Sequence, residues 1–97
     1  MNIGKIRLRI SGGFAGLMRG TDAGAEELTA DERRALDHHL AHGQVGHAGD
    51  ARDLLQYELE AETDSGTRRI AFDEMNTPAD LADLVHRLAE RAKPVRP

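Results

Sequence analysis

Four histidines lie close together in the middle of the chain, and their spacing suits metal binding. His38 and His42 are four residues apart, with His39 between them, so two rings can share one face of a helix, and His47 and Asp50 follow. Imidazole and carboxylate groups in such an arrangement could bind zinc. No glutamate directly follows the first histidine as in the HExxH motif, and an exposed helix face commonly carries histidines without a ligand. We therefore assign no metal site; a small metal-dependent enzyme built on these histidines remains an alternative.

Other catalytic chemistry finds few candidate residues. The chain has no cysteine, which excludes a thiolate nucleophile, and its two serines, Ser11 and Ser65, both lie in turn-like sequence. Neither occupies a G-x-S-x-G elbow between a strand and a helix. The glycines after Ser11 are not a dinucleotide-binding motif, because a strand rather than a helix is expected to follow them. We predict no catalytic residue, no cofactor and no enzymatic activity.

Alternating hydrophobic and charged residues predict the strands that would position any site. Residues 5–10 and 54–62 each alternate strictly, which is typical of half-buried strands. Residues 68–73 are predicted to return from the second of these after the turn Asp64-Ser65-Gly66. Residues 14–19 are predicted to return from the first.

Two helices follow from capping signals, and the segments rich in glycine and polar residues between elements are predicted to be loops. Thr29 and Glu32 form a capping box, which predicts a helix from there to about His42. Thr77 is predicted as the N-cap of a last helix, with Pro78 in its first position. The apolar stripe of that helix consists of Leu81, Leu84, Val85 and Leu88. The predicted loops are residues 20–28 and 43–53.

The charges on the strands indicate how they are ordered. The solvent-facing side of the first strand is basic and that of the third is acidic, and opposite charges across a strand pair stabilise the pairing. The stripes are Lys5, Arg7 and Arg9 against Glu58, Glu60 and Glu62. We therefore predict an α+β fold of order ββαββα. Its four-stranded antiparallel sheet has the order 2-1-3-4, and both helices pack on one face.

Composition limits the domain count and the partners. The 97 residues suffice for one domain, predicted as residues 1–92 with a flexible tail at 93–97. The net charge of −4 disfavours nucleic acid and anionic membranes as partners, and the basic stripe lacks interleaved aromatic residues. We see neither a signal peptide nor a hydrophobic run of transmembrane length, so we expect a cytoplasmic location. We also expect a monomer.

The segment Ser11-Gly12-Gly13-Phe14-Ala15-Gly16-Leu17 is the most informative in the chain. Glycine adopts positive φ freely, so Gly12-Gly13 can form the tight turn of a β-hairpin. The same lack of side chains lets the backbone of another molecule approach closely. A plain hairpin turn without a binding role is the simpler interpretation of the same residues.

This segment, after the strand Ile6-Arg7-Leu8-Arg9-Ile10, resembles the start of emfourin. The resemblance continues through Tyr57-Glu58-Leu59 and through Asp73-Glu74-Met75-Asn76-Thr77-Pro78 before the last helix, and it covers nearly the whole chain. Emfourin-like proteins are small inhibitors of thermolysin-type (M4) zinc metalloproteases, notably the protealysin-like ones. The resemblance therefore implies an M4 protease as the partner.

An inhibitor needs a stiff segment that fills a cleft at a small entropy cost, and residues 11–16 could be that segment. Its contact residues would be Ser11, Gly12, Gly13, Phe14, Ala15 and Gly16, with His47 and Asp50 from the later loop as a second contact. Phe14 would enter the apolar pocket beside the enzyme's zinc, or else cover this protein's own core. A regulatory or scaffold module that binds a partner other than a protease is the alternative function.

Overall fold

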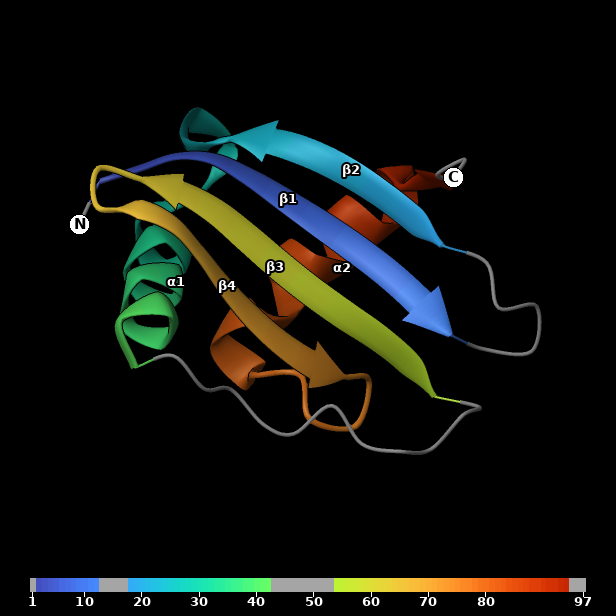
Figure 1. The fold of residues 1–97 in the computed structure, drawn as a ribbon. Helices are drawn as coiled ribbons and strands as arrows, with labels where there is room; N and C mark the ends of the chain where they lie inside the picture. The colour runs from blue at the N-terminus through green and yellow to red at the C-terminus, as the bar shows by residue number, and fades with distance from the viewer. Residues whose placement is uncertain (1, 13–17, 43–53, 95–97) are drawn as a thin grey trace.

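The computed structural model describes residues 2–12, 18–42 and 54–94, which form an antiparallel sheet covered on one face by two helices (Figure 1). The strands are β1 (Ile3–Gly12), β2 (Arg19–Gly24), β3 (Leu55–Thr63), β4 (Gly66–Asp73) and β5 (Lys93–Pro94), and the helices are α1 (Ala30–His42) and α2 (Ala82–Arg91). Short 3₁₀ turns, η1 (Ala25–Glu27) and η2 (Ala79–Leu81), precede α1 and α2. The sheet order is β4-β3-β1-β2-β5. The α+β class and the 2-1-3-4 order are confirmed, but the sheet has five strands rather than four.

The basic and acidic stripes face each other across β1 and β3, as their charges predict. The register pairs Lys5 with Glu62, Arg7 with Glu60 and Arg9 with Glu58. The Nη1 atom of Arg9 lies 3.6 Å from Oε1 of Glu58. The side chain of Arg7 turns to the other neighbouring strand, where its Nε donates to Oδ1 of Asp22 at 2.9 Å. The central strand is therefore flanked by carboxylates on both sides.

The second strand lies further along the chain than the sequence predicts. It spans Arg19–Gly24, so residues 20–24 form a strand where the sequence predicts a loop. Most of the strand predicted at 14–19, residues 14–17, lies outside the described residues. The polar sequence of β2 gives little local signal for a strand. Its stability comes from pairing with β1 and from Asp22, whose carboxylate lies 2.9 Å from Arg7 and 3.5 Å from Lys5. Ala23 contributes the one buried side chain of this strand.

The fifth strand occupies the first two residues of the segment predicted as a tail, and residues 95–97 of that segment lie outside the described residues. Gly20 and Arg19 of β2 pair with Lys93 and Pro94. The guanidinium of Arg91 donates to the carbonyl oxygen of Asp22 at 2.9 Å and so holds the end of α2 against β2. Proline is tolerated here because β5 is an edge strand of the sheet, where its missing N–H breaks no ladder.

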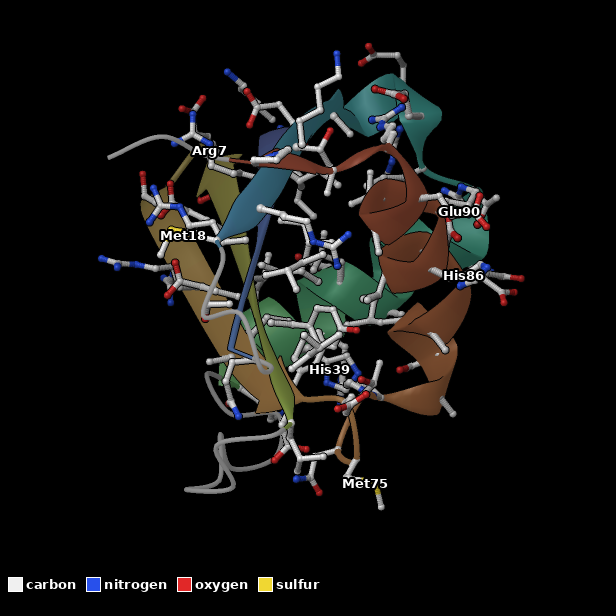
Figure 2. All side chains as sticks on the ribbon, turned by 90° about the vertical axis from the view of Figure 1, so that its right-hand side faces the viewer. Arg7, Met18, His39, Met75, His86 and Glu90 are labelled. Atoms are coloured by element: carbon white, nitrogen blue, oxygen red, sulfur yellow. The ribbon has the colours of Figure 1, made fainter. Side chains whose placement is uncertain are left out.

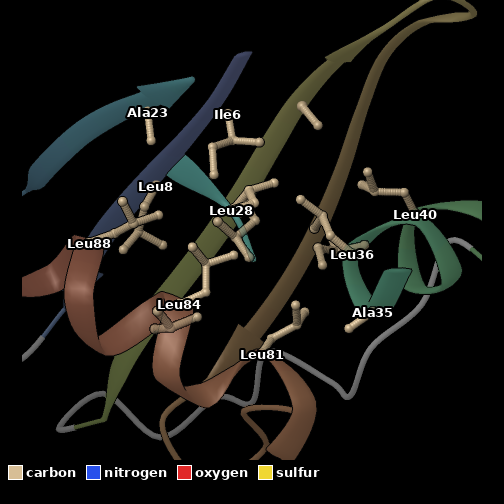
Figure 3. Packing of buried hydrophobic residues seen from close by; sticks show 14 of the residues in the cluster. Ile6, Leu8, Ala23, Leu28, Ala35, Leu36, Leu40, Leu81, Leu84 and Leu88 are labelled. Atoms are coloured by element: carbon tan, nitrogen blue, oxygen red, sulfur yellow. The ribbon is translucent and has the colours of Figure 1, made fainter. Parts of the chain in front are cut away.

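The core lies between the sheet and the helices and is mainly aliphatic (Figure 3). Ile6, Leu8 and Ile10 of β1 are each at most 1% exposed. The predicted stripe of the last helix is confirmed, and Leu36 and Leu40 of α1 are also buried. The side chain of Phe72 in β4 is fully buried among them.

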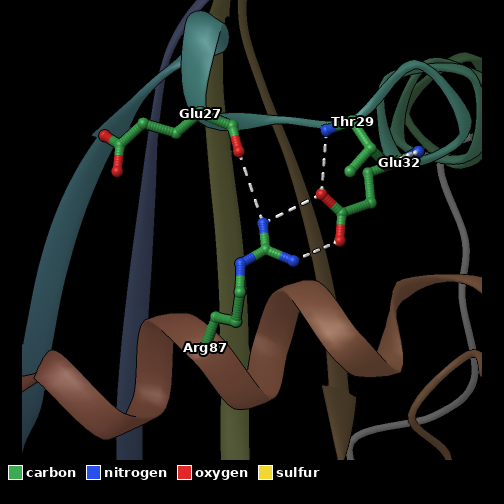
Figure 4. A network of polar contacts seen from close by, with 4 residues as sticks. All are labelled: Glu27, Thr29, Glu32 and Arg87. Atoms are coloured by element: carbon green, nitrogen blue, oxygen red, sulfur yellow. Dashed lines mark hydrogen bonds and ion pairs between the residues drawn. The ribbon is translucent and has the colours of Figure 1, made fainter.

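A bidentate ion pair joins the two helices (Figure 4). Glu32 is 7% exposed, and its carboxylate accepts hydrogen bonds from both terminal nitrogens of Arg87, at 2.5 and 2.9 Å. The predicted capping box is confirmed, because Glu32 also accepts from the N–H of Thr29 at 3.0 Å and its own N–H donates to the Thr29 hydroxyl. Arg87 further donates to the carbonyl oxygen of Glu27. One carboxylate thus caps α1 and binds α2.

We expect Arg87→Met to destabilise the fold by about 1–2 kcal/mol, because it leaves a buried carboxylate without its cationic partner. Charged hydrogen bonds contribute about 1.5–3 kcal/mol, and partial solvent exposure of the arginine reduces this. Arg34→Met is the matched control, since its ion pair with Asp31 is exposed on both sides. Urea unfolding measures both; equal stability of the two variants would contradict the prediction.

We expect stability to fall in acid, and Glu32→Gln to reduce that pH dependence. The hydrogen bond from Arg87 holds the pKa of Glu32 below its ordinary value, and burial opposes this only partly. A lowered native pKa means that the unfolded state binds more protons, so this contribution is complete above about pH 4.3 and is lost as the pH falls through the native pKa. Arg7 and Arg91 similarly lower the pKa values of Asp22 and Glu27, so some dependence remains. Urea unfolding midpoints of the unmodified protein and of Glu32→Gln, measured between pH 3 and pH 7, test this prediction. If the midpoints of the two proteins fall equally with decreasing pH, the prediction is wrong.

Candidate functional site

One end of the sheet carries the described part of the glycine segment. Here β1 ends, β2 and β3 begin and β4 leads into a loop (Figure 1). We call this the hairpin end and define it by Ser11, Gly12, Met18, Leu55 and the loop 73–77. Ser11 pairs with Gln56 and Gly12 with Leu55. Of the predicted contact residues, Gly13, Phe14, Ala15, Gly16, His47 and Asp50 lie outside the described residues.

The backbone of β1 requires glycine at position 12. Its φ is +94°, and a Cβ atom placed on it would lie 2.8 Å from the carbonyl oxygen of Leu54. A side chain would therefore meet both an unfavourable conformation and the neighbouring backbone. Among the described residues, pairing between β1 and β2 ends with Ile10 and Arg19. Gly12 itself belongs to β1 and pairs with Leu55 of β3. Gly13, the other residue of the predicted tight turn, lies outside the described residues.

A tightly hydrogen-bonded loop after β4 forms the other side of the hairpin end. Asp73 is 2% exposed, and its Oδ1 accepts from the N–H of Met75 and from the side-chain amide of Asn76, both at 2.9 Å. Glu74 binds Leu55 twice: its N–H donates to the Leu55 carbonyl at 3.1 Å, and its carboxylate accepts from the Leu55 N–H at 2.9 Å. The loop is thus anchored to β3 beside the residue that pairs with Gly12.

Thr77 belongs to this loop and is not the predicted helix cap. Its hydroxyl donates to the carbonyl oxygen of Asp73 at 3.1 Å, and no side chain caps the 3₁₀ turn η2 after Pro78. That carbonyl oxygen also accepts from the N–H of Asn76 at 3.1 Å, so the threonine hydroxyl adds a second hydrogen bond that closes the loop. Thr77 thus makes a side chain-to-backbone hydrogen bond, but its partner is the Asp73 carbonyl and not an N–H group of the last helix.

Large hydrophobic side chains are exposed at this end. Among the described residues, Met18 is 47% exposed and Met75 is 76% exposed, and Figure 2 shows them on different sides of the end that faces the viewer. A hollow of about 210 Å³ lies here as well. Its lining consists of Arg9, Ser11, Met18, Gln56, Tyr57, Glu58 and Ala71. Another protein bound at this end could cover either methionine, although the two do not form one continuous apolar patch.

Tyr57 packs against the core at the hairpin end. Its ring stacks on that of Phe72 with the centroids 5.7 Å apart. Burial, followed by the nearby carboxylate of Glu74, raises the pKa of its hydroxyl above the ordinary value. Tyr57 is therefore a neutral, packed residue at neutral pH, and its structural role is to support β3 next to Leu55.

The described histidines make contacts within the protein. His39 Nε2 lies 2.9 Å from Oδ1 of Asp80, and Nδ1 of His42 lies 2.8 Å from the carbonyl oxygen of His38. The rings of His38 and His42 are 4.3 Å apart, so they share a helix face as predicted. No group of three potential metal ligands occurs among residues 2–12, 18–42 and 54–94. His86 is exposed, and its Nε2 lies 2.9 Å from Oε1 of Glu90 (Figure 2).

Most of the chain matches a known protein family. Residues 8–89 match the family model described as Emfourin. The chain belongs to the emfourin family. This family has a protease-inhibitor role, in keeping with the prediction that the chain is not an enzyme. No curated protein and no solved structure matches the chain.

The matched range includes every part of the hairpin end. The sequence located Ser11 and Gly12, but it identified loop 73–77 only as the approach to a helix. The signal that could have found this loop is Asp73 followed by Asn76 and Thr77, residue types that hold turns through side chain-to-backbone hydrogen bonds. Within the described residues, no helix is long and apolar enough to span a membrane.

Gly12→Ala should destabilise the protein more than Gly66→Ala. Both glycines have positive φ, but a Cβ atom on Gly66 would meet nothing within 4 Å, whereas one on Gly12 would clash with the Leu54 carbonyl. We expect a loss of about 1–3 kcal/mol at Gly12 from strain and displacement of β3. Chemical unfolding of the two variants isolates the clash, and an equal loss at both positions would argue against it.

Proposed function

We propose that this protein inhibits a thermolysin-like M4 zinc metalloprotease by inserting its hairpin end into the active-site cleft. The observation that carries the proposal is the match of residues 8–89 to emfourin, a family with a protease-inhibitor role. The hairpin end adds physical support, since it combines a glycine segment with exposed apolar side chains on a paired sheet. Blocking a cleft requires no catalytic residue and no cofactor in the inhibitor.

The mechanism follows from what residues 11–16 contain. Glycines let the main chain lie close to the cleft walls and pair with an edge strand of the enzyme. β1 is paired with β3 up to Gly12, so the base of the segment is already ordered before binding. The segment therefore loses less conformational freedom on binding than an unstructured peptide would, and its binding costs less free energy. In this proposal Phe14 enters the apolar pocket beside the zinc, while His47 and Asp50 make a second contact.

The expected setting is the cytoplasm of a cell that makes such a protease. An inhibitor there would protect the cell's own proteins from premature proteolysis. We propose that it acts as a monomer, with one inhibitor occupying one cleft.

Titration of the purified protein into thermolysin and into a protealysin-type enzyme tests the proposal. We expect proteolysis of a peptide substrate to fall with added inhibitor, with trypsin as a protease that should be unaffected. Undiminished activity of both metalloproteases at micromolar inhibitor would reject the proposed function. Capture of a stable partner that is not a protease would instead favour the regulatory-module alternative.

Gly13→Trp should abolish inhibition with little effect on folding, because it places a bulky side chain in the segment proposed to enter the cleft. Ser65→Trp is the matched control, since it adds the same side chain at the exposed turn between β3 and β4. Inhibition constants and circular dichroism measure the two effects. Full potency of a folded Gly13→Trp protein would remove this segment from the mechanism.

A further inference from the structure

We propose that Met75 is a second protease contact, and that its side chain enters an apolar subsite of the same cleft. The inference rests on the proposed function and extends it to loop 73–77. The partner surface is thereby specified: a concave, apolar-lined groove that binds extended peptide, with one subsite for the glycine segment and another for an unbranched side chain.

Exposure of Met75 is the first observation behind this inference. It is 76% exposed, the most exposed of the large hydrophobic side chains in the described residues, and it points away from the body of the protein (Figure 2). Burying a methionine side chain is strongly favourable, so a partner that covers it gains affinity. Its unbranched thioether also adapts to pockets of different shape.

Rigidity of the loop is the second observation. The N–H of Met75 is bound by Asp73, Glu74 is bound by both backbone groups of Leu55, and Thr77 closes the loop on the Asp73 carbonyl. A side chain presented on an ordered backbone loses less entropy on binding than one on a free loop. The carboxylates of Asp73 and Glu74 accept hydrogen bonds within the protein, so methionine is the apolar feature that this loop offers.

Position relative to the glycine segment is the third observation. β2, β1, β3 and β4 are successive neighbours in the sheet, so three strand spacings of about 4.8 Å each separate the outer two, roughly 14 Å in all. An extended peptide of about four residues covers the same length at about 3.3 Å per residue. One substrate-binding groove can therefore receive both the glycine segment and Met75.

Leu55 connects the two contacts. It pairs with Gly12 on one side and with Glu74 on the other, so the start of β3 holds the two segments at a fixed separation. Two contacts on one rigid support fix the orientation of the inhibitor in the groove, which a single inserted segment would leave free to rotate.

Three variants test the role of Met75 against thermolysin and a protealysin-type enzyme. We expect Met75→Asp to raise the inhibition constant about tenfold or more, because it places a charge in an apolar subsite. Met75→Leu should retain potency within about threefold, since leucine is of similar volume and polarity. Thr67→Asp, which adds the same charge at the exposed opposite end of β4, should inhibit like the unmodified protein. Wild-type potency of Met75→Asp would overturn the inference.

A second measurement uses the unmodified sequence and so does not depend on the folding of a variant. With methyl-¹³C methionine, the Met75 signal should shift and lose its accessibility to a soluble paramagnetic agent when the protease is added. An unchanged, accessible Met75 methyl in a complex that does inhibit would show that the inference is wrong while the proposed function stands. Failure of the unmodified protein to inhibit either enzyme would remove both.

Discussion

Pairing of β1 on both sides is the constraint on which the rest of this structure depends. β1 supplies Ile6, Leu8 and Ile10 to the core, and it is bound to β3 as far as Gly12 but to β2 only as far as Ile10. The two ladders therefore end at different places. The strand that organises the core is the same one that leads into the glycine segment, so the stability of the sheet is transmitted directly to the base of the hairpin end.

Much of this framework could be predicted because it is encoded locally. Strict alternation identifies β1 and β3, the Thr29–Glu32 capping box identifies the start of α1, and the opposite charges of the two strands indicate that they are neighbours. β2 and β5 could not be predicted in this way. Arg19–Gly24 has no hydrophobic pattern, and Lys93–Pro94 contains a residue that disfavours strands. Both strands depend on partners that are distant in the sequence. In β2, Asp22 is bound by Arg7 of β1. β5 follows α2, whose end is held to the Asp22 carbonyl by Arg91.

The site divides in the same manner. Ser11 and Gly12 belong to a segment whose composition is unusual enough to be noticed. Gly12 does need to be glycine, because its φ is positive and the Leu54 carbonyl lies where a Cβ atom would be. Loop 73–77 has no such composition. Thr77-Pro78 carries a normal signal for the start of a helix, but the buried Asp73 takes the threonine hydroxyl for its own carbonyl. The conformation of this loop also depends on the hydrogen bonds between Glu74 and Leu55 of β3, which are tertiary contacts and cannot be deduced from neighbouring residues.

The arrangement around Leu55 explains how a small domain with few aromatic residues could present a stiff binding surface. Large binding segments usually incur an ordering cost, and a domain of this size has little core with which to offset it. Here the cost is divided among contacts that the fold makes in any case: Gly12 is held by the β1–β3 ladder, and Glu74 by hydrogen bonds to Leu55. Because both anchors meet at one residue of β3, a change at the start of that strand would disturb both segments together. In the proposed function, Leu55 would therefore influence the geometry of binding without touching the partner.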